Sequence, residues 1–503
     1  MAHMRPEPLS LVNRGTDELG SIIDHTYYNS DLVVAFLTNK KLRSDLRILS
    51  SNTHFDVRIR EGEPAIDCFK LGRKIIALRQ FNIVEINLSM QITDAQLQEM
   101  QQNAPFLNAS ITEENIEELK FLLNTFKFCP NLQILNLSGR CVCDRDMIQF
   151  MEGLACCKNL QSLDLSRNCI ESSFTHLEKY LPNFSKLSSL NMSANPVRMV
   201  YISNGFLQAL GRSCADFQDL DLSNLDITCF SNHNTMLSSF SQLSTLRSLN
   251  LYNVEFANDY AEIIGAAISL CTNLTCLTMG KTHISDDDNW LELMDQLSGL
   301  TQMRSLKITD DNLGSLSTYS IPFKSLTHLD LSNNLLKDDG CIHIADAMEE
   351  FCMLKTLNLS NNGIGHEGTK HLQDGIKQCE LTSLNLENNP SITSKGLCHL
   401  AIGMKMQHEK FKGNPHRTIN NLNLQRNGID GRDGLKSIAF ILRLCPNLQN
   451  MNISENHLDG YCLDEIKVKN NLRKRPVHII MDCSFDGFFL AQIPPQFALS
   501  FFQ

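Results

Sequence analysis

The chain has 503 residues and a formal net charge of −11, from 45 Lys and Arg against 56 Asp and Glu. This acidic balance argues against non-specific binding to nucleic acid, because phosphates repel a negatively charged surface. We also expect no membrane span and no secretory signal segment, since the chain begins without an apolar run of the required kind.

The first 53 residues lack the repeated pattern that dominates the remainder. Within them, Ser30 precedes an apolar run that ends at Leu37, which is how a capped helix begins. We therefore expect residues 1–53 to form an N-terminal helical cap over the first repeat.

Residues 54–482 repeat one short apolar pattern, most often at intervals of roughly 27 to 30 residues. In a typical unit, Leu160, Leu163 and Leu165 are followed by Asn168 and Ile170. The first apolar position recurs at Leu132, Leu160, Leu187, Phe217, Leu246, Leu274, Met303, Leu326, Leu354, Leu381, Ile419 and Leu448. Ile83 starts a thirteenth unit, and the repeats degenerate at both ends.

Each unit predicts a strand, a turn and a helix. Alternating leucines suit a short strand, and the following Asn can hydrogen-bond the backbone where the chain turns. Farther on, Leu372 and Ile376 lie four residues apart and share one helical face. Neither element can bury its apolar side alone, so stacked units should form an α/β solenoid with a parallel sheet.

The clearest units run from Leu326 to Gly340 and from Leu354 to Ile364. Repeats of this length and pattern resemble the ribonuclease-inhibitor-like class of leucine-rich-repeat proteins. The resemblance implies a horseshoe with the sheet on its concave face and helices on its convex face. It also implies large, specific protein partners.

The unit that starts at Leu381 is longer than the others, because the next unit begins only at Ile419, and it holds an insertion near 395–418. Insertions that break a regular repeat often carry binding loops, and this one is basic. Together with cations two units later, it predicts a secondary basic edge. Its members are Lys405, Lys410, Lys412, Arg417, Arg473, Lys474 and Arg475. A solvated charged face is the plainer interpretation.

Side chains between the leucines should point out of the sheet, because neighbouring strand residues alternate faces. Most are Asn or Asp, which we expect to form a hydrogen-bonded ladder across the sheet. The chemistry is most varied from Phe217 to Asp310, where an aromatic residue stands among charges, as at many interfaces. The predicted protein-binding residues are Asp219, Asp221, Tyr252, Asn253, Lys281, Lys307 and Asp310. Any one of them is equally well explained as part of a solvated strand face.

No catalytic, cofactor or metal site is predicted. Gly363, Gly365 and Gly368 match a dinucleotide-binding pattern, but neighbouring repeats carry glycines in the same slot, so the turn and helix start explain them. Neither a nucleophile motif, a metal-ligand pair nor a phosphate-loop lysine appears. We expect a non-enzymatic protein.

Several of the 18 cysteines recur two or three residues before the first apolar position of a repeat, for example Cys157 and Cys271. Thiols in one structural slot behave as small apolar core residues, which favours a reducing, cytoplasmic location. Residues 483–503 are rich in Phe and are expected to cap the last repeat, or else to serve as a docking tail.

These features favour an intracellular scaffold that binds a protein partner through the concave face. Two alternatives remain open: a bacterial effector that targets a host protein, and a regulatory protein that activates a GTPase.

Overall fold

The computed structural model describes residues 55–58, 83–87, 94, 98, 125–140, 142–172, 174–196, 204–225, 233–254, 261–284, 286–315, 321, 325–350, 353–414, 416–471, 473 and 476–481. The expected N-terminal cap and the C-terminal segment 483–503 lie outside these residues. The chain divides into two compact units. The first comprises Met1–Ser285 and Glu292–Met303, and the second comprises Asp286–Leu291 and Arg304–Gln503.

Short strands alternate with helices in the first unit. Its strands are β1 (Phe55–Arg58), β2 (Ile83–Asn87), β3 (Ile134–Asn136), β4 (Ser162–Asp164), β5 (Ser189–Asn191), β6 (Asp219–Asp221), β7 (Ser248–Tyr252) and β8 (Cys276–Gly280). Its helices are η2 (Phe126–Phe128), α7 (Asp144–Leu154), α8 (Phe174–Tyr180), η3 (Leu181–Asn183), α9 (Asn204–Ser213), α10 (His233–Phe240) and α11 (Ala261–Ser269). Helix α12 (Asp287–Leu297) contains residues of both units.

The second unit continues the same alternation with longer helices. Its strands are β9 (Ser305–Thr309), β10 (His328–Asp330), β11 (Thr356–Asn358), β12 (Ser383–Asn385), β13 (Asn421–Asn423), β14 (Asn450–Asn452) and β15 (His478–Ile480). Its other helices are α13 (Lys337–Glu350), α14 (His366–Gln378), α15 (Thr393–Lys410), α16 (Gly431–Leu444) and α17 (Gly460–Asn471). The insertion predicted near 395–418 includes most of α15, which has 18 residues.

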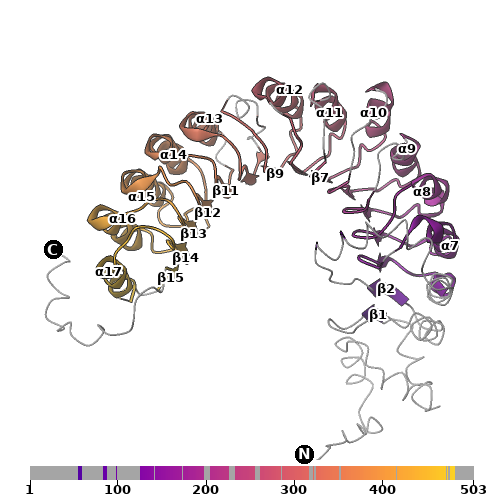
Figure 1. Cartoon of the computed structure of the whole chain (residues 1–503), viewed down its shortest axis with the longest axis horizontal. Coiled ribbons are helices and arrows are strands. Elements are labelled where there is room, and N and C mark those ends of the chain that lie inside the picture. The colour runs from indigo at the N-terminus through magenta and orange to yellow at the C-terminus, as the bar shows by residue number, and fades with distance from the viewer. Residues whose placement is uncertain are drawn as a thin grey trace, which may run out of the picture. The chain divides into compact units, whose positions relative to one another are not determined.

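Within each unit the strands are parallel and lie in chain order, β1 to β8 and β9 to β15. Equivalent leucines stand side by side, so that Leu329 pairs with Leu357 and Leu357 with Leu384. In each unit the described helices lie on one side of the strands, and no described helix covers the other side (Figure 1). We call this other side the strand face. The predicted α/β solenoid with a parallel sheet is confirmed.

The core of each unit lies between its strands and its helices. Leu357 points inward and is 1% exposed, whereas the next residue, Asn358, faces outward and is half-buried. Aromatic side chains fill the space behind the strands of the first unit, where the rings of Phe174 and Phe206 meet edge to face at 4.9 Å. The register deduced from the leucine spacing is therefore confirmed.

A buried Asn joins neighbouring repeats at the predicted turn. The Asn389 amide donates to the backbone oxygens of Leu359 at 3.0 Å and Leu386 at 2.9 Å. Its side-chain oxygen accepts from the backbone N–H groups of Asn362 and Ile364, each at 3.0 Å. Each such Asn thus satisfies backbone groups of the preceding repeat that would otherwise be buried without partners.

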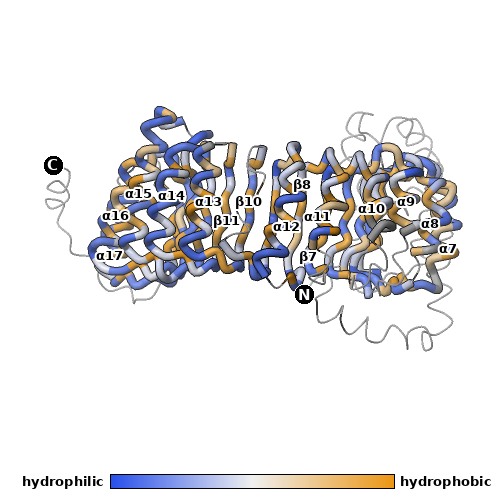
Figure 2. The backbone as a smooth tube through the Cα atoms, turned by 90° about the horizontal axis from the view of Figure 1, so that it is seen from above, coloured by the Kyte–Doolittle hydropathy of each residue, from blue (hydrophilic) through white to orange (hydrophobic). Residues whose placement is uncertain are grey.

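Glycines allow the helices of the second unit to pack closely. A Cβ atom on Gly375 of α14 would lie 3.1 Å from the Ala345 Cα of α13, and one on Gly403 of α15 would lie 2.9 Å from the Gln373 carbonyl oxygen. Figure 2 shows α13 to α16 side by side in this unit. Because these neighbouring helices can approach closely, the strands connected to them can also lie side by side in the sheet.

The repeated cysteines are core residues. The Cys157 thiol donates to the Phe126 carbonyl at 3.4 Å, and the Cys214 thiol donates to the Phe184 carbonyl at the same distance. Burial raises the pKa of both thiols to about 12. These contacts cross from one repeat to the preceding one, so the thiol acts as a weak donor within the packed interior.

Candidate functional site

Outward-facing residues of the strand face mostly complete their own turns. At ten of the twelve positions between the second and third leucines, an Asn or Asp oxygen accepts the backbone N–H two residues later. The expected ladder across the sheet is therefore wrong for this position. One direct link between such neighbours occurs in the described residues, from Asn250 to Asp221 at 3.1 Å. The oxygens of these side chains are engaged in hydrogen bonds within the chain, so they contribute little to selectivity for a binding partner.

Two repeats depart from this rule, with Thr278 on β8 and Lys307 on β9. Lysine has no acceptor, so Lys307 cannot complete the turn in this way. Its ammonium group instead lies 3.7 Å from an oxygen of Asp330, and the two side chains are 46% and 26% exposed. An exposed pair at this distance is weak, so its charges remain accessible to other groups.

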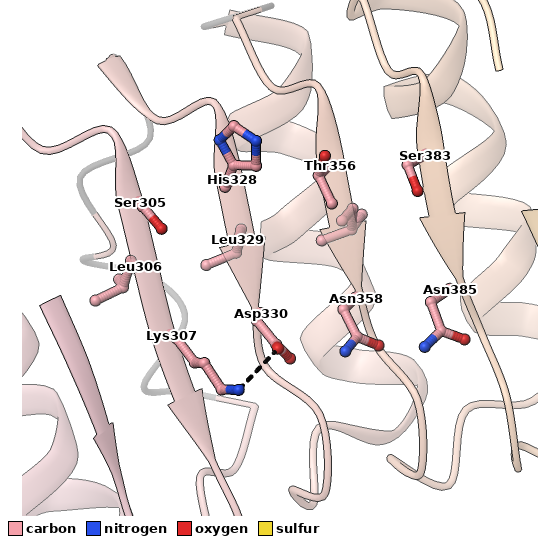
Figure 3. Close-up of a pocket in the computed structure, with 11 residues that line it drawn as sticks. Ser305, Leu306, Lys307, His328, Leu329, Asp330, Thr356, Asn358, Ser383 and Asn385 are labelled. Atoms are coloured by element: carbon pink, nitrogen blue, oxygen red, sulfur yellow. Dashed lines mark ion pairs between the residues drawn. The ribbon is translucent and has the colours of Figure 1, made fainter. Parts of the chain in front are cut away.

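Lys307 borders a shallow hollow of about 360 Å³ on the strand face of the second unit. Two rows of side chains cross β9 to β12 there (Figure 3). One row holds Ser305, His328, Thr356 and Ser383, and the other holds Lys307, Asp330, Asn358 and Asn385. The exposed imidazole of His328 lies 2.8 Å from the Thr327 hydroxyl. Sequence reasoning missed His328, because a single His among Ser and Thr gave no pattern.

Tyr252 and Lys281 lie together on the strand face of the first unit. The Lys281 ammonium stands 5.6 Å from the centre of the Tyr252 ring, within the range of a cation–π contact. The ring is half-buried and the lysine is exposed. The sequence-based grouping of these two residues thus corresponds to a direct contact, with an apolar ring and a cation presented to solvent.

Asp219 and Asp221 lie on β6 in the same unit. Burial raises the pKa of the Asp219 carboxyl, while the nearby Arg247 opposes that shift. Asp221 accepts hydrogen bonds from the Ser223 backbone and hydroxyl at 2.9 and 2.7 Å. Asp219 is exposed, whereas Asp221 is held by its own turn, so Asp219 is the more available of the two carboxylates.

Asn253, Lys281 and Asp310 occupy equivalent places in their repeats, where the backbone is left-handed. Their φ angles are 55°, 47° and 60°. Asn and Asp tolerate this conformation better than most residues, which gives Asn253 and Asp310 a structural role. Asn253 donates to Asn224 at 3.1 Å, and Asp310 accepts from Asn333 at 2.9 Å. Lysine has no such preference, so the left-handed turn does not explain Lys281.

Several cations of the predicted basic edge have partners close by. Lys405 lies 3.6 Å from Glu409, and the Arg417 Nε lies 3.1 Å from Glu380. Arg473 donates to the carbonyl of Leu442 and, at 3.1 Å, to that of Cys445, so it caps the end of α16. Lys412 is exposed on the loop that follows α15. Lys474 and Arg475 lie outside the described residues.

The glycine motif at Gly363, Gly365 and Gly368 has a structural explanation. One carboxylate oxygen of Asp338, from the preceding repeat, accepts the backbone N–H groups of Gly365 and Gly368 at 2.7 and 2.8 Å. A Cβ on Gly368 would lie 2.5 Å from that oxygen, and Gly363 has φ of +67°. Asp338 thus fills the helix N-terminus where a phosphate would bind in a nucleotide site.

Searches for other kinds of site give two findings. No cluster of three or more His, Cys, Asp and Glu residues suited to a metal ion occurs among the residues with described positions. No helix in the described ranges is long and apolar enough to cross a bilayer.

A family model described as Leucine Rich repeat matches residues 156–173, 324–345 and 352–370. The first segment contains β4, the second contains β10 and the start of α13, and the third contains β11 and the start of α14. All three matches contain the strand and the turn of a repeat, and the second and third also contain the helix start. These three segments are leucine-rich repeats. Each carries the leucines and the joining Asn described above.

Three solved structures of low identity are similar to this chain. An internalin, InlF, from Listeria monocytogenes is 16% identical over 78% of this chain and 96% of its own, with a TM-score of 0.40. A leucine-rich-repeat protein from Leptospira interrogans is 17% identical over 88% of this chain and 93% of its own, with a TM-score of 0.47. Internalin C2 from Listeria monocytogenes is 16% identical over 43% and 76%, with a TM-score of 0.29. No curated protein matches the chain.

Proposed function

We propose that this protein is a non-enzymatic, intracellular scaffold that binds a protein partner through the strand face of its repeats. The observation that carries the proposal is the break in the turn-completing series at Lys307. At that point Lys307 stands where other repeats have an Asn or Asp that hydrogen-bonds its own turn, and it borders a shallow hollow. A row of small hydroxyl and amide groups around a charged pair suits a polar protein surface better than a small apolar ligand.

A second patch in the first unit supports the same function. Tyr252 and Lys281 present a ring and a cation in contact, a combination enriched at the energetic centres of protein interfaces. Asp219, Asp221, Asn253 and Asp310 complete the predicted set, and we assign them a supporting role, since three of them are engaged in turns or ladders.

Two further features support the assignment. Repeats of this length with full helices fit the ribonuclease-inhibitor-like class, whose members bind proteins. Most of the described cysteines are free and buried in the repeat core, which suits a reducing compartment such as the cytoplasm. We further propose that residues 1–53 and 483–503 cap the two ends of the repeat array, because the end repeats of solenoids need cover.

The proposal is tested by isolating a partner with the purified protein and measuring its affinity for variants by calorimetry. Tyr252→Ala combined with Lys281→Glu should weaken binding by at least about 2 kcal/mol if the first-unit patch is an energetic centre. Lys307→Glu should weaken binding if the hollow of the second unit is used, because it places a second carboxylate beside Asp330. Lys436→Glu, on the outer side of α16, is the matched control. Full affinity in both strand-face variants, with folding intact, would refute the proposed surface.

A further inference from the structure

The basic insertion is a rigid element fixed at its base. Gln407, near the end of α15, is fully buried, and both ends of its amide are used. Its nitrogen donates to the carbonyls of Cys379 at 3.1 Å and Leu381 at 2.9 Å, and its oxygen accepts the Ile419 backbone N–H at 3.1 Å. A polar group buried in this way holds the extra helical turns against the preceding repeat and the next strand.

The loop that follows α15 is clamped on two sides. The Asn447 amide, from the next repeat, donates to the Gly413 carbonyl at 2.8 Å and to the Thr418 hydroxyl at 3.1 Å. On the other side, Lys410, the last residue of α15, donates from its ammonium group to the Gln378 carbonyl at 3.1 Å and so holds the helix end from which the loop starts. A clamped loop loses little conformational freedom when it binds, so its charges are pre-organised for a ligand.

Cations gather along this element. The exposed side chains of Lys405, Lys412 and Arg417 lie on α15 and its loop. The ring of Phe411 lies between two of the charges, with the Lys410 ammonium 5.5 Å and the Arg417 guanidinium 5.9 Å from its centre. We name the set formed by Lys355, Lys405, Lys410, Phe411, Lys412 and Arg417 the insertion edge.

The carboxylate of Glu380 already binds two cations of the insertion edge. Glu380 has Lys355 on one of its oxygens and the Arg417 Nε at 3.1 Å from the other. Lys355 also donates to the His416 carbonyl at 3.4 Å, so its ammonium group is held toward the loop. Two cations on one carboxylate that is 22% exposed leave an excess of positive charge, which a second carboxylate can neutralise.

We propose that the insertion edge binds an acidic polypeptide segment of a partner, with carboxylates at Lys405 and Lys412 and a further one shared by Lys355 and Arg417. A polypeptide fits better than a nucleic acid because Glu380 and Glu409 are interleaved with the cations. Carboxylates spaced along a peptide can reach the cations between these two residues, whereas the closely spaced phosphates of a nucleic acid would also face Glu380 and Glu409. This surface is separate from the strand face, and the inference does not depend on the function proposed for that face.

The test uses the full chain and a short fluorescein-labelled peptide of alternating Glu and Ser, with fluorescence anisotropy as the readout. A Gln and Ser peptide is the neutral control. The wild type should bind the acidic peptide with an affinity that falls as salt rises, because exposed charges are screened. Lys405→Glu combined with Lys412→Glu should weaken binding roughly tenfold or more, in line with paired charges at an interface.

The variant Glu380→Gln distinguishes binding at a defined site from non-specific attraction of the acidic peptide to positive charge. It releases Lys355 and Arg417 from their internal carboxylate, so the affinity for the acidic peptide should rise several-fold. Lys436→Glu makes the same charge reversal on α16, away from the edge, and should leave the affinity unchanged. Hydrogen exchange at the Ile419 amide shows whether each variant keeps the insertion in place.

Four outcomes would overturn the inference. They are no binding of the acidic peptide by the wild type, equal loss in the edge and control variants, no gain on Glu380→Gln, and tighter binding of a single-stranded oligonucleotide of equal charge. Tyr252→Ala should leave peptide binding intact, so failure at this edge is distinguishable from failure of the strand-face proposal.

Discussion

Replacing Asn389 by Leu should destabilise the second unit and expose two specific amides. The Asn389 side chain is fully buried and makes hydrogen bonds to backbone groups of two repeats. Leucine has similar volume but can replace none of these bonds. The N–H groups of Asn362 and Ile364 then lose their acceptor inside the protein.

An unsatisfied buried donor costs about 1 to 3 kcal/mol, so the two together predict a loss of roughly 2 to 6 kcal/mol in the free energy of unfolding. Urea unfolding followed by circular dichroism measures the total. Hydrogen exchange supplies the local readout, because only the amides of Asn362 and Ile364 should lose protection before global unfolding.

Asn388→Gly is the matched control for this change. Asn388 is the adjacent residue, has φ of 56°, and donates to Asn361 at 2.8 Å on the surface. Glycine keeps the left-handed backbone without strain, so the loss should be below about 1 kcal/mol. If the Asn389 variant matched the control in both stability and exchange, the buried Asn would not be what joins the repeats, and the reasoning would be refuted.

Three further predictions concern the core. Leu357→Ala should lower the free energy of unfolding by roughly 2 to 5 kcal/mol, while Asn358→Ala should cost far less; equal losses in denaturant titrations would contradict the strand register. Alkylation followed by mass spectrometry should label the exposed Cys156 quickly and the buried Cys157 only after unfolding. Burial raises the pKa of the Cys157 thiol from 9.0 to about 12, so at a pH between these values the unfolded chain loses a thiol proton that the folded chain keeps. The free energy of unfolding should therefore fall as the pH rises through this range. Unchanged unfolding midpoints between pH 8 and about 11 would argue against buried thiols.

The leucine spacing was sufficient to predict the strands, their parallel order and the buried positions. A residue such as Leu329 must face inward when its immediate neighbours, His328 and Asp330, are polar, because successive side chains of a strand point to opposite faces. The joining Asn was also predictable, because a turn out of a sheet leaves backbone groups without partners.

Contacts between residues one repeat apart were harder to predict. Nothing in the sequence shows that Asp338 reaches the start of the next helix, or that Arg473 caps the previous one. Arg473 was assigned to the basic edge by its charge alone, and a charge in a sequence does not reveal the carbonyl or N–H group beside it. For the same reason, Glu380 was not recognised as the partner of Arg417.

The change in repeat chemistry near the middle of the chain was visible but was interpreted only as varied surface. The slot filled by Asn168 and Asn195 holds Leu225, Val254 and Thr282 in the later repeats of the first unit. These residues cannot make the same set of bonds between repeats. The repeat that starts at Met303 is also shorter than its neighbours, because the next one already begins at Leu326. Thr282 and this short repeat both lie next to the division of the chain into its two units.

The bonds between repeats impose an order on the nascent chain as it leaves the ribosome. The turn at Ile364 is complete only when Asn389, some 25 residues later, has emerged, whereas the start of α14 is capped by Asp338, which is already outside. The acceptor for the start of this helix therefore lies in the repeat synthesised before it, whereas the acceptor for the turn lies in the repeat synthesised after it. A ribosome stalled within this array would hold one unfinished turn next to the exit tunnel, however many repeats had already folded.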